Sequence, residues 1–280
     1  MDLKLKGRTC LITGASGGIG RALSQVFAAE GANLVLHGNS QLAALRDWVA
    51  QQPFADRVEV AGADLRSVDE VEGLFRQAQA RFGRVDHCVA NAGMWPRPDE
   101  SLHEASAERV ADTVAINLLG SAWTVRAWMR NLAAHSPRSD EGASAVLIGS
   151  TAGRFGEAFH ADYAMAKAGL VGLMRSVKNE LPHVDPLARI NLVEPGWTVT
   201  HMAREALSKP GVIEKVVRTM PLRQLGRAED VAHQVAMLCS PVSGHVSGQI
   251  VTVAGGMEGR MLWEPSDIEE SAIRDRAMRP

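Results

Sequence analysis

A short apolar strand, a glycine-rich turn and a helix follow one another near the start of the chain, and this order restricts the fold most. We expect residues 8–12 (RTCLI) to form the strand, residues 13–20 (TGASGGIG) the turn and residues 21–31 the helix. Glycines let a backbone approach a ligand closely, and a helix amino terminus offers free N–H groups and a positive dipole end. The segment therefore predicts a site for the pyrophosphate of a dinucleotide.

The rest of the chain alternates apolar strands with helices of ten or more residues. Such alternation is typical of right-handed β-α-β units with parallel strands. We expect an α/β, Rossmann-type doubly wound fold with helices on both faces, formed by a single domain (residues 1–257) and followed by a charged tail or oligomer arm (residues 258–280). The seven expected parallel strands are residues 8–12, 33–37, 57–61, 86–90, 145–149, 189–193 and 249–253, and one long helix is expected from 106 to about 134.

Tyr163, the only tyrosine in the chain, precedes Lys167 by four residues on an expected helix. Residues at this spacing lie on one helix face, and a nearby ammonium should lower the phenol pKa from its ordinary value of about 10. Ser150 ends a buried strand, at the edge where α/β sheets bind ligands. These three residues predict an acid–base site, although a packed tyrosine beside a solvated lysine would give the same spacing.

Composition narrows the possible partners. The net charge is -2 and the pI is near 6.5, so no basic excess is present to bind nucleic acid or an anionic membrane. The three cysteines lie in apolar runs, and we expect buried free thiols rather than disulfides or metal ligands. No apolar stretch reaches the roughly 20 residues of a membrane span, and the amino terminus lacks a signal-type core. We expect a cytoplasmic protein with a small-molecule partner and no metal.

The end of the second strand bears on the choice of cofactor. Gly38, Asn39 and Ser40 include neither an acid, which would repel a 2′-phosphate, nor a base, which would attract it. The missing acid favours NADP over NAD. Asp64 is expected to bond the adenine amino group or to cap a helix, and Thr200 to bond a cofactor carboxamide or phosphate. His37 is interpreted as a strand-end residue, and residues 201–220 as a mobile lid.

Taken together, these motifs resemble the short-chain dehydrogenase/reductase family in its one-domain form, over residues 5–257. The resemblance rests on the TGxxxGxG turn at 13–20, on Asn91-Ala92-Gly93, on Pro195-Gly196 with Thr200, and on four positions that match the family's catalytic set: Asn117, Ser150, Tyr163 and Lys167. Gly17 replaces an arginine frequent in NADP-preferring relatives, and Ala254 stands where aspartate is common. Both departures weaken the cofactor prediction and leave the catalytic one intact.

The resemblance implies hydride exchange between a nicotinamide and a carbonyl or alcohol carbon. Tyr163 would transfer the proton, Ser150 would bond the substrate oxygen, Lys167 would lower the Tyr163 pKa and bind the nicotinamide ribose, and Asn117 would hold a relay water. The predicted cofactor-binding residues are Gly14, Ser16, Gly17, Gly18, Ile19, Gly20, Asn39, Ser40, Asp64, Leu65, Asn91, Ala92, Gly93, Tyr163, Lys167, Pro195, Gly196, Thr198 and Thr200.

The substrate is less constrained by the sequence. The chain is most similar in character to 3-oxoacyl-carrier-protein reductases, which implies a carrier-protein or CoA thioester; a secondary alcohol, a sugar or a steroid fits the same motifs. A basic rim would favour an acidic carrier protein, with candidates Arg130, Arg154, Arg204 and Lys209. Candidate substrate residues are Ser150, Trp95, Arg154, Phe159, Trp197 and Met202, and the segment 151–162, which has no clear period, is expected to line a pocket wall.

Assembly and two alternatives complete the predictions. The family is usually dimeric or tetrameric through its two long helices, here about 106–134 and 160–181, which implies a homodimer or homotetramer. The glycine spacing also fits the extended branch of epimerases and dehydratases. A protein of another class, a nucleotide sensor without turnover, would keep the fold and lose catalytic residues, whereas all four positions are filled here.

Overall fold

The computed structural model describes residues 2–137 and 141–277, with the side chains of residues 201 and 202 left aside. Its centre is one parallel sheet with strand order β3-β2-β1-β4-β5-β6-β9, which confirms the expected seven-stranded, doubly wound α/β fold. The order reverses between β1 and β4, and ligands of such sheets bind at the carboxyl ends of the strands beside this point. The strands are β1 (Thr9–Ile12), β2 (Asn33–Gly38), β3 (Val58–Gly62), β4 (His87–Ala90), β5 (Ser144–Ile148), β6 (Arg189–Pro195) and β9 (Ile250–Val253).

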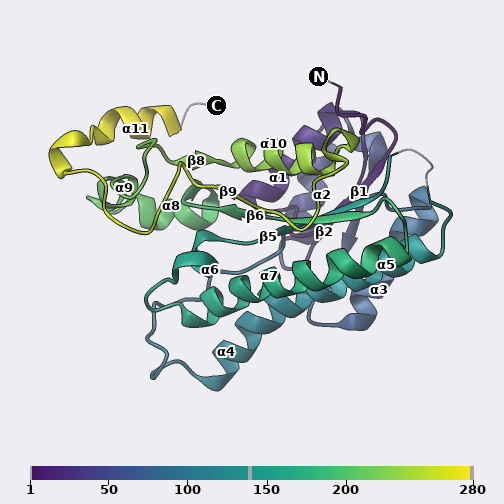
Figure 1. Cartoon of the computed structure of the whole chain (residues 1–280), viewed down its shortest axis with the longest axis horizontal. Helices are drawn as coiled ribbons and strands as arrows, with labels where there is room; N and C mark the ends of the chain where they lie inside the picture. The colour runs from purple at the N-terminus through teal and green to yellow at the C-terminus, as the bar shows by residue number, and fades with distance from the viewer. Residues whose placement is uncertain (1, 138–140, 278–280) are drawn as a thin grey trace.

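Helices cover both faces of the sheet (Figure 1). On one face lie α1 (Gly18–Ala29), α2 (Leu42–Ala50) and α10 (Ala228–Cys239), and on the other α3 (Val68–Phe82), α4 (Ala107–Val114), α5 (Gly120–Ala133) and α7 (Ala161–Glu180).

Alternate strand residues supply the two cores. Cys10 and Ile12 of β1 belong to the cluster formed with α1, α2 and α10, whereas Leu11 belongs to the one formed with α3, α5 and α7. The largest fully buried side chain in these cores is Trp128 of α5. Burying such a side chain contributes about 1.5–3 kcal/mol, and the sum over both cores holds the strand ends in place.

The single long helix expected from 106 to 134 is interrupted. A π-helical segment, η2 (Ala115–Leu119), separates α4 from α5. Such segments shift backbone carbonyls out of the α-helical register and are frequent at functional sites. The segment 151–162 also differs from the expectation, because its first part forms a short helix, α6 (Thr151–Phe155), after Ser150.

The segment between β6 and α10 and the chain after β9 form a small layer beside the main sheet. The strands β7 (Thr198–Val199) and β8 (Gly226–Arg227) pair with each other, and α8 (His201–Leu207) and α9 (Val212–Val217) occupy the segment interpreted as a lid. The carboxyl-terminal helix α11 (Glu270–Ala277) packs against α9 through Ile273, beside Ile213 and Val217. Residues 258–277 therefore lie on the lid, at one end of the molecule (Figure 1). The short helical turns are η1 (Ala55–Arg57), η3 (Leu181–His183), η4 (Pro241–Ser243) and η5 (Pro265–Asp267).

Two further expectations concern the environment of the protein. Cys10, Cys88 and Cys239 are buried and free, as expected. Among the described residues, no helix is both long and apolar enough to cross a membrane.

Candidate active site

The glycine-rich turn lies at the carboxyl end of β1, as the sequence predicts. Gly14 has a φ of 65°, a conformation that favours glycine, and a Cβ at Gly20 would lie 2.6 Å from the Ala15 Cα atom. Within the described chain, no side chain caps α1 and its first turn carries no acid. The first N–H groups of α1 are therefore free to receive an anion, so the turn fits a dinucleotide pyrophosphate.

His37 holds this turn from the neighbouring strand. Its Nδ1 atom accepts the Gly14 N–H at 3.2 Å, and its Nε2 atom lies 2.9 Å from the Ala63 carbonyl oxygen, to which it donates. The ring is 2% exposed, and burial lowers its pKa, which favours the neutral imidazole that these two bonds require. The strand-end interpretation of His37 is confirmed, but its contact with the turn was missed, because 23 residues separate the partners.

The Asn91-Ala92-Gly93 segment connects the turn to the catalytic residues. The Asn91 side-chain amide donates to the Thr13 carbonyl oxygen at 2.8 Å, so this side chain braces the turn. Gly93 is needed for space: a Cβ there would lie 2.7 Å from Asn117 Oδ1 and 3.3 Å from Lys167 Nζ.

Ser150, Tyr163 and Lys167 meet at the carboxyl end of β5. Ser150 follows β5 and caps α6, accepting the Ala152 N–H at 3.1 Å, and its hydroxyl also bonds the Tyr163 hydroxyl. Lys167 is buried, and its ammonium donates to the Ile148 carbonyl oxygen at 2.9 Å. One strand end and one helix therefore bring together three groups that can bind and move a proton.

The pKa of Tyr163 differs from the sequence-based expectation. Burial raises the pKa of Tyr163 to about 12, and the bond from Ser150 opposes this only in part. Lys167 Nζ lies 5.7 Å from the Tyr163 ring centroid and is bonded to the backbone instead. Burial lowers the pKa of Lys167 to about 8. The expected lowering of the phenol pKa by Lys167 is therefore wrong for this arrangement, because loss of hydration outweighs a distant charge.

Asn117 lies inside η2 with its side chain fully buried. Its amide donates to the carbonyl oxygens of Met94 and Thr113, each at 3.0 Å, and its Oδ1 accepts the Met94 N–H at 3.1 Å. Both ends of the Asn117 amide are thus hydrogen-bonded to Met94 in the loop after β4. The relay water expected at Asn117 stays a prediction, and the shifted backbone of η2 is the group beside it that could hold one.

The expected wall residues have different surroundings. Trp95 contacts the catalytic tyrosine, with ring centroids 4.9 Å apart. Phe159 is 58% exposed, and Trp197 packs into the cluster beneath the lid. Arg154 donates to Glu194 at 2.8 Å, a buried carboxylate of β6, so its charge is already neutralised. The Met202 side chain lies outside the described residues.

The remaining cofactor candidates divide into free and engaged side chains. Asn39 and Ser40 are exposed at the end of β2. The Asp64 carboxylate is bonded by Arg66, which lowers its pKa, and Leu65 is buried in the core. Thr198 bonds the Gly196 carbonyl oxygen.

Thr200 lies against the glycine-rich turn. A Cβ on Gly18 would lie 2.9 Å from the Thr200 methyl group. The loop after β6 and the start of the lid therefore close over the beginning of α1.

Sequence reasoning missed a second group of polar residues beside Tyr163. Asp162 is buried, its Oδ1 accepts the Tyr163 N–H at 2.9 Å, and its Oδ2 accepts Arg109 Nε and Thr113 Oγ1, each at 3.1 Å. The only signal in the sequence was an acid directly before the tyrosine. Its partners lie 49 and 53 residues away, so the contact could not be inferred from spacing.

A doubly wound sheet, an uncapped glycine-rich turn at its switch point and a Ser–Tyr–Lys set with a buried lysine together define a dinucleotide-dependent oxidoreductase. A family model described as enoyl-(acyl carrier protein) reductase matches residues 14–258. The chain belongs to the short-chain dehydrogenase/reductase family, whose members use NAD(P) and act on CH–OH and C=O groups.

Relatives with assigned activities cover almost the whole chain. A (3R)-3-hydroxyacyl-CoA dehydrogenase of Canis lupus familiaris is 32% identical, over 91% of this chain and 98% of its own. The 3-oxoacyl-(acyl-carrier-protein) reductase FabG of Escherichia coli is 31% identical, over 91% and 99%. A Brucella melitensis structure solved as a short-chain dehydrogenase/reductase of the glucose/ribitol dehydrogenase type superposes with a TM-score of 0.83, at 31% identity, over 92% and 99%.

Proposed function

We propose that the protein reduces a 3-oxoacyl thioester, with Tyr163 as proton donor. The observation that carries this proposal is the buried phenol bonded to Ser150 beside Lys167. A bound nicotinamide would supply or accept the hydride. Because burial keeps the Tyr163 phenol protonated at neutral pH, it can donate to a carbonyl oxygen, which the Ser150 hydroxyl binds as charge develops there.

The remaining residues hold and orient the reactants. The backbone of Gly14–Gly20 and the start of α1 would bind the pyrophosphate, and Gly93 leaves room beside Lys167 for the nicotinamide ribose. The shifted backbone of η2 at Asn117 would hold the relay water, and the Asn117 side chain would fix the loop after β4 at Met94. We propose NADP rather than NAD, supported by the two exposed side chains Asn39 and Ser40 and by the lack of an acid at this strand end.

The substrate class rests on two observations. Two relatives are named for acyl thioesters, and both are matched along nearly their whole length. Trp95 also contacts the Tyr163 ring, and the segment between Ser150 and Tyr163 carries two exposed apolar rings, Phe155 and Phe159, which are 41% and 58% exposed. The neutralised Arg154 does not add to a basic rim. A sugar alcohol is the second candidate, supported by the glucose/ribitol type of the similar structure.

The decisive experiment is the initial rate of NADPH and NADH consumption with a 3-oxoacyl thioester and with a panel of ketones and sugars. We expect Tyr163→Phe to bind cofactor normally and to lose at least about a hundredfold in turnover, since the general acid is removed. Near-normal turnover by this variant would contradict the assignment. Cofactor binding without consumption by the wild type would favour the nucleotide-sensing alternative.

We also propose a cytoplasmic homodimer or homotetramer, built from one catalytic domain of residues 1–257. The buried free thiols support a reducing compartment. Assembly through α4–α5 and α7 is supported by Leu119 of η2 and Met165 of α7, which are apolar and 40% and 53% exposed.

A further inference from the structure

We propose that His160 is a positioning residue that fixes Trp95 against Tyr163 and so sets the substrate-side wall of the active site. This inference rests on the proposed function, because it concerns how substrate meets the catalytic tyrosine. His160 is the residue before α7, three positions ahead of Tyr163, and its side chain is 3% exposed.

The Trp95 ring contacts both the His160 ring and the Tyr163 ring. The Trp95 ring lies 4.0 Å from the His160 ring at an interplanar angle of 31°, and 4.9 Å from the Tyr163 ring at 61°. Aromatic contacts of these two geometries contribute about 0.5–1.5 kcal/mol each. The indole is thus held on both sides by residues of the same helix start, and Trp95 itself is only partly buried. Its accessible part forms a wall beside the reacting hydroxyl.

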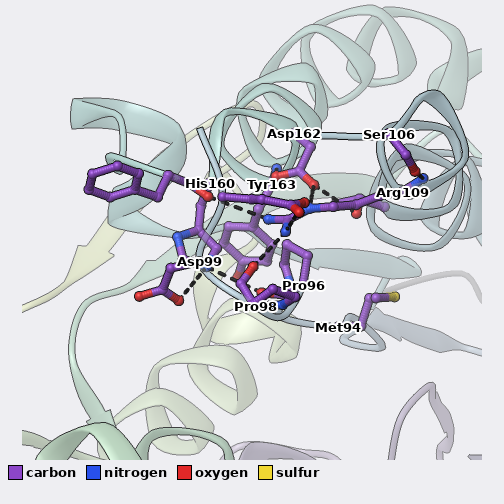
Figure 2. A network of polar contacts seen from close by, with 12 residues as sticks. Met94, Pro96, Pro98, Asp99, Ser106, Arg109, His160, Asp162 and Tyr163 are labelled. Carbon is purple, nitrogen blue, oxygen red and sulfur yellow. Dashed lines mark hydrogen bonds and ion pairs between the residues drawn. The ribbon is translucent and has the colours of Figure 1, made fainter. Parts of the chain in front are cut away.

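Polar contacts fix the His160 imidazole against the Trp95 ring. Nε2 lies 3.2 Å from the Pro96 carbonyl oxygen and 3.4 Å from Asp99 Oδ1, and Nδ1 lies 3.3 Å from the Ala158 carbonyl oxygen (Figure 2). Carbonyl oxygens only accept hydrogen bonds, whereas a neutral imidazole has a single N–H. The contacts at both ring nitrogens limit how far the imidazole can turn away from Trp95.

Three carboxylates lie around this ring. They come from the wall loop (residues 94–100), from the turn before α7 and from α7 itself: Asp99, Glu157 and Asp162. Glu157 interacts with Lys215 of α9 as well as with His160, and the Asp162 carboxylate is bonded by Arg109.

A second anchor holds the same loop without involving His160. Arg109 donates to the Pro98 carbonyl oxygen and to Glu100 Oε2 while its Nε binds Asp162 (Figure 2). The Glu100 N–H also bonds the Phe159 carbonyl oxygen at 3.2 Å. Removal of the His160 contacts should therefore loosen the part of the wall loop around Trp95 without detaching the loop.

This arrangement predicts a specific change in kinetics. A free Trp95 would contact substrate less well in the ground state, whereas Ser150, Tyr163 and Lys167 keep their own bonds. The substrate KM should rise while kcat and the cofactor KM stay nearly constant.

The test compares His160→Phe, which keeps a ring on Trp95 but has no polar contact, with His160→Gln, which keeps one donor. The matched control is His103→Gln, an exposed histidine that bonds only Ser101 among the described side chains. We would measure the substrate KM, kcat and the cofactor KM, and hydrogen exchange of the amides in residues 94–100.

For His160→Phe we expect a substrate KM at least about fivefold higher, kcat within about twofold and faster exchange in residues 94–100. His160→Gln should fall between this variant and the wild type, and His103→Gln should match the wild type. Unchanged exchange and KM in both His160 variants would overturn the proposal, as would a loss confined to kcat or to the cofactor KM. If the wild type turns over no substrate, the proposed function fails, whereas the exchange result still decides the role of His160.

Discussion

Tyr163 is subject to two opposing influences. Burial removes hydration from the phenolate and raises the pKa of Tyr163 to about 12, whereas only the Ser150 hydroxyl lowers it. Lys167 lies one helical turn away, but its ammonium is bonded to Ile148. The residue pair predicted from the sequence is present, and its electrostatic coupling is weaker than the spacing suggests. The protonated phenol suits reduction rather than oxidation.

This balance predicts different pH profiles for the two directions. Alcohol oxidation needs a base, so its kcat/KM should rise by up to about tenfold per pH unit from pH 6 to 9 without a plateau, because Tyr163 with a pKa of about 12 stays protonated throughout. Carbonyl reduction uses the phenol, and Tyr163 should impose no loss over the same range. Initial rates in both directions at saturating cofactor check this prediction.

A plateau of the oxidation rate below pH 8 would contradict it, and would mean that the working site stabilises the phenolate. Tyr163→Phe gives the background rate at each pH. Burial lowers the pKa of Lys167 to about 8. An inflection of the pH profile near pH 8 would therefore report Tyr163 and Lys167 together rather than Tyr163 alone.

At the scale of elements, strand ends are joined by side chains that the sequence pattern does not reveal. His37 at the end of β2 bonds the turn after β1 and the end of β3, and Asn117 bonds η2 to the loop after β4. Each joins segments that are adjacent only in the folded sheet. The positions of the strands and the buried faces of the helices follow from periodicity, whereas these cross-links depend on which strand ends become neighbours in the sheet.

We expect His37→Leu to raise the cofactor KM several-fold and to lower the free energy of unfolding by about 1–3 kcal/mol, since the Gly14 N–H and the Ala63 carbonyl both lose a buried partner. His37→Gln, which can donate and accept, should recover part of both. Cofactor titration and denaturant unfolding measure the two effects. A cofactor KM that is normal in His37→Leu would show that the turn does not need this bond.

The same residue predicts a pH dependence of stability. Because the pKa of His37 is lowered in the folded state, the unfolded chain binds more protons below its ordinary value of about 6.5. Wild-type stability should therefore fall as the pH drops from 6.5 towards the folded pKa. This part of the decline should be absent in His37→Leu.

At the scale of the whole molecule, the carboxyl-terminal segment belongs to the lid layer. Trp263 Nε1 donates to the Met220 carbonyl oxygen at 2.8 Å, and Arg223 lies over the Trp263 ring at 4.4 Å. Arg218 Nε donates to the Trp263 carbonyl oxygen at 2.7 Å. The segment from 258 on was expected to be a tail or an oligomer arm; within the monomer it secures the end of the lid, and its role as an arm stays a prediction.

Trp263→Ala should loosen the lid, because both the indole bond and the contact with Arg223 are lost. We expect faster tryptic cleavage after Arg204 in α8 and after Lys215 in α9, and a substrate KM several-fold higher. Trp263→Phe keeps the ring and should lie nearer the wild type. Equal cleavage rates for the wild type and Trp263→Ala would show that the carboxyl-terminal segment does not limit the mobility of the lid.

Assembly gives the last prediction. If η2 and α7 form the subunit interface, Met165→Glu should shift the mass in solution towards the 30.1 kDa of one chain, because a charge would be buried in an apolar contact. Leu187→Glu, at a residue 50% exposed outside these elements, is the matched control. Light scattering after size exclusion measures both, and a monomeric wild type would contradict the proposed oligomer.

The sequence alone determined the order of strands and helices, the glycine-rich turn and the Ser150–Tyr163–Lys167 set, because periodicity, glycine content and helix spacing are local properties. Only the tertiary structure decided the π segment at Asn117, the bond from His37 to the turn, the stack of His160 on Trp95 and the raised pKa of Tyr163. These depend on burial and on contacts between residues up to 65 positions apart in the chain. Hydration lost on folding and partners brought in by the sheet have no counterpart in the local sequence.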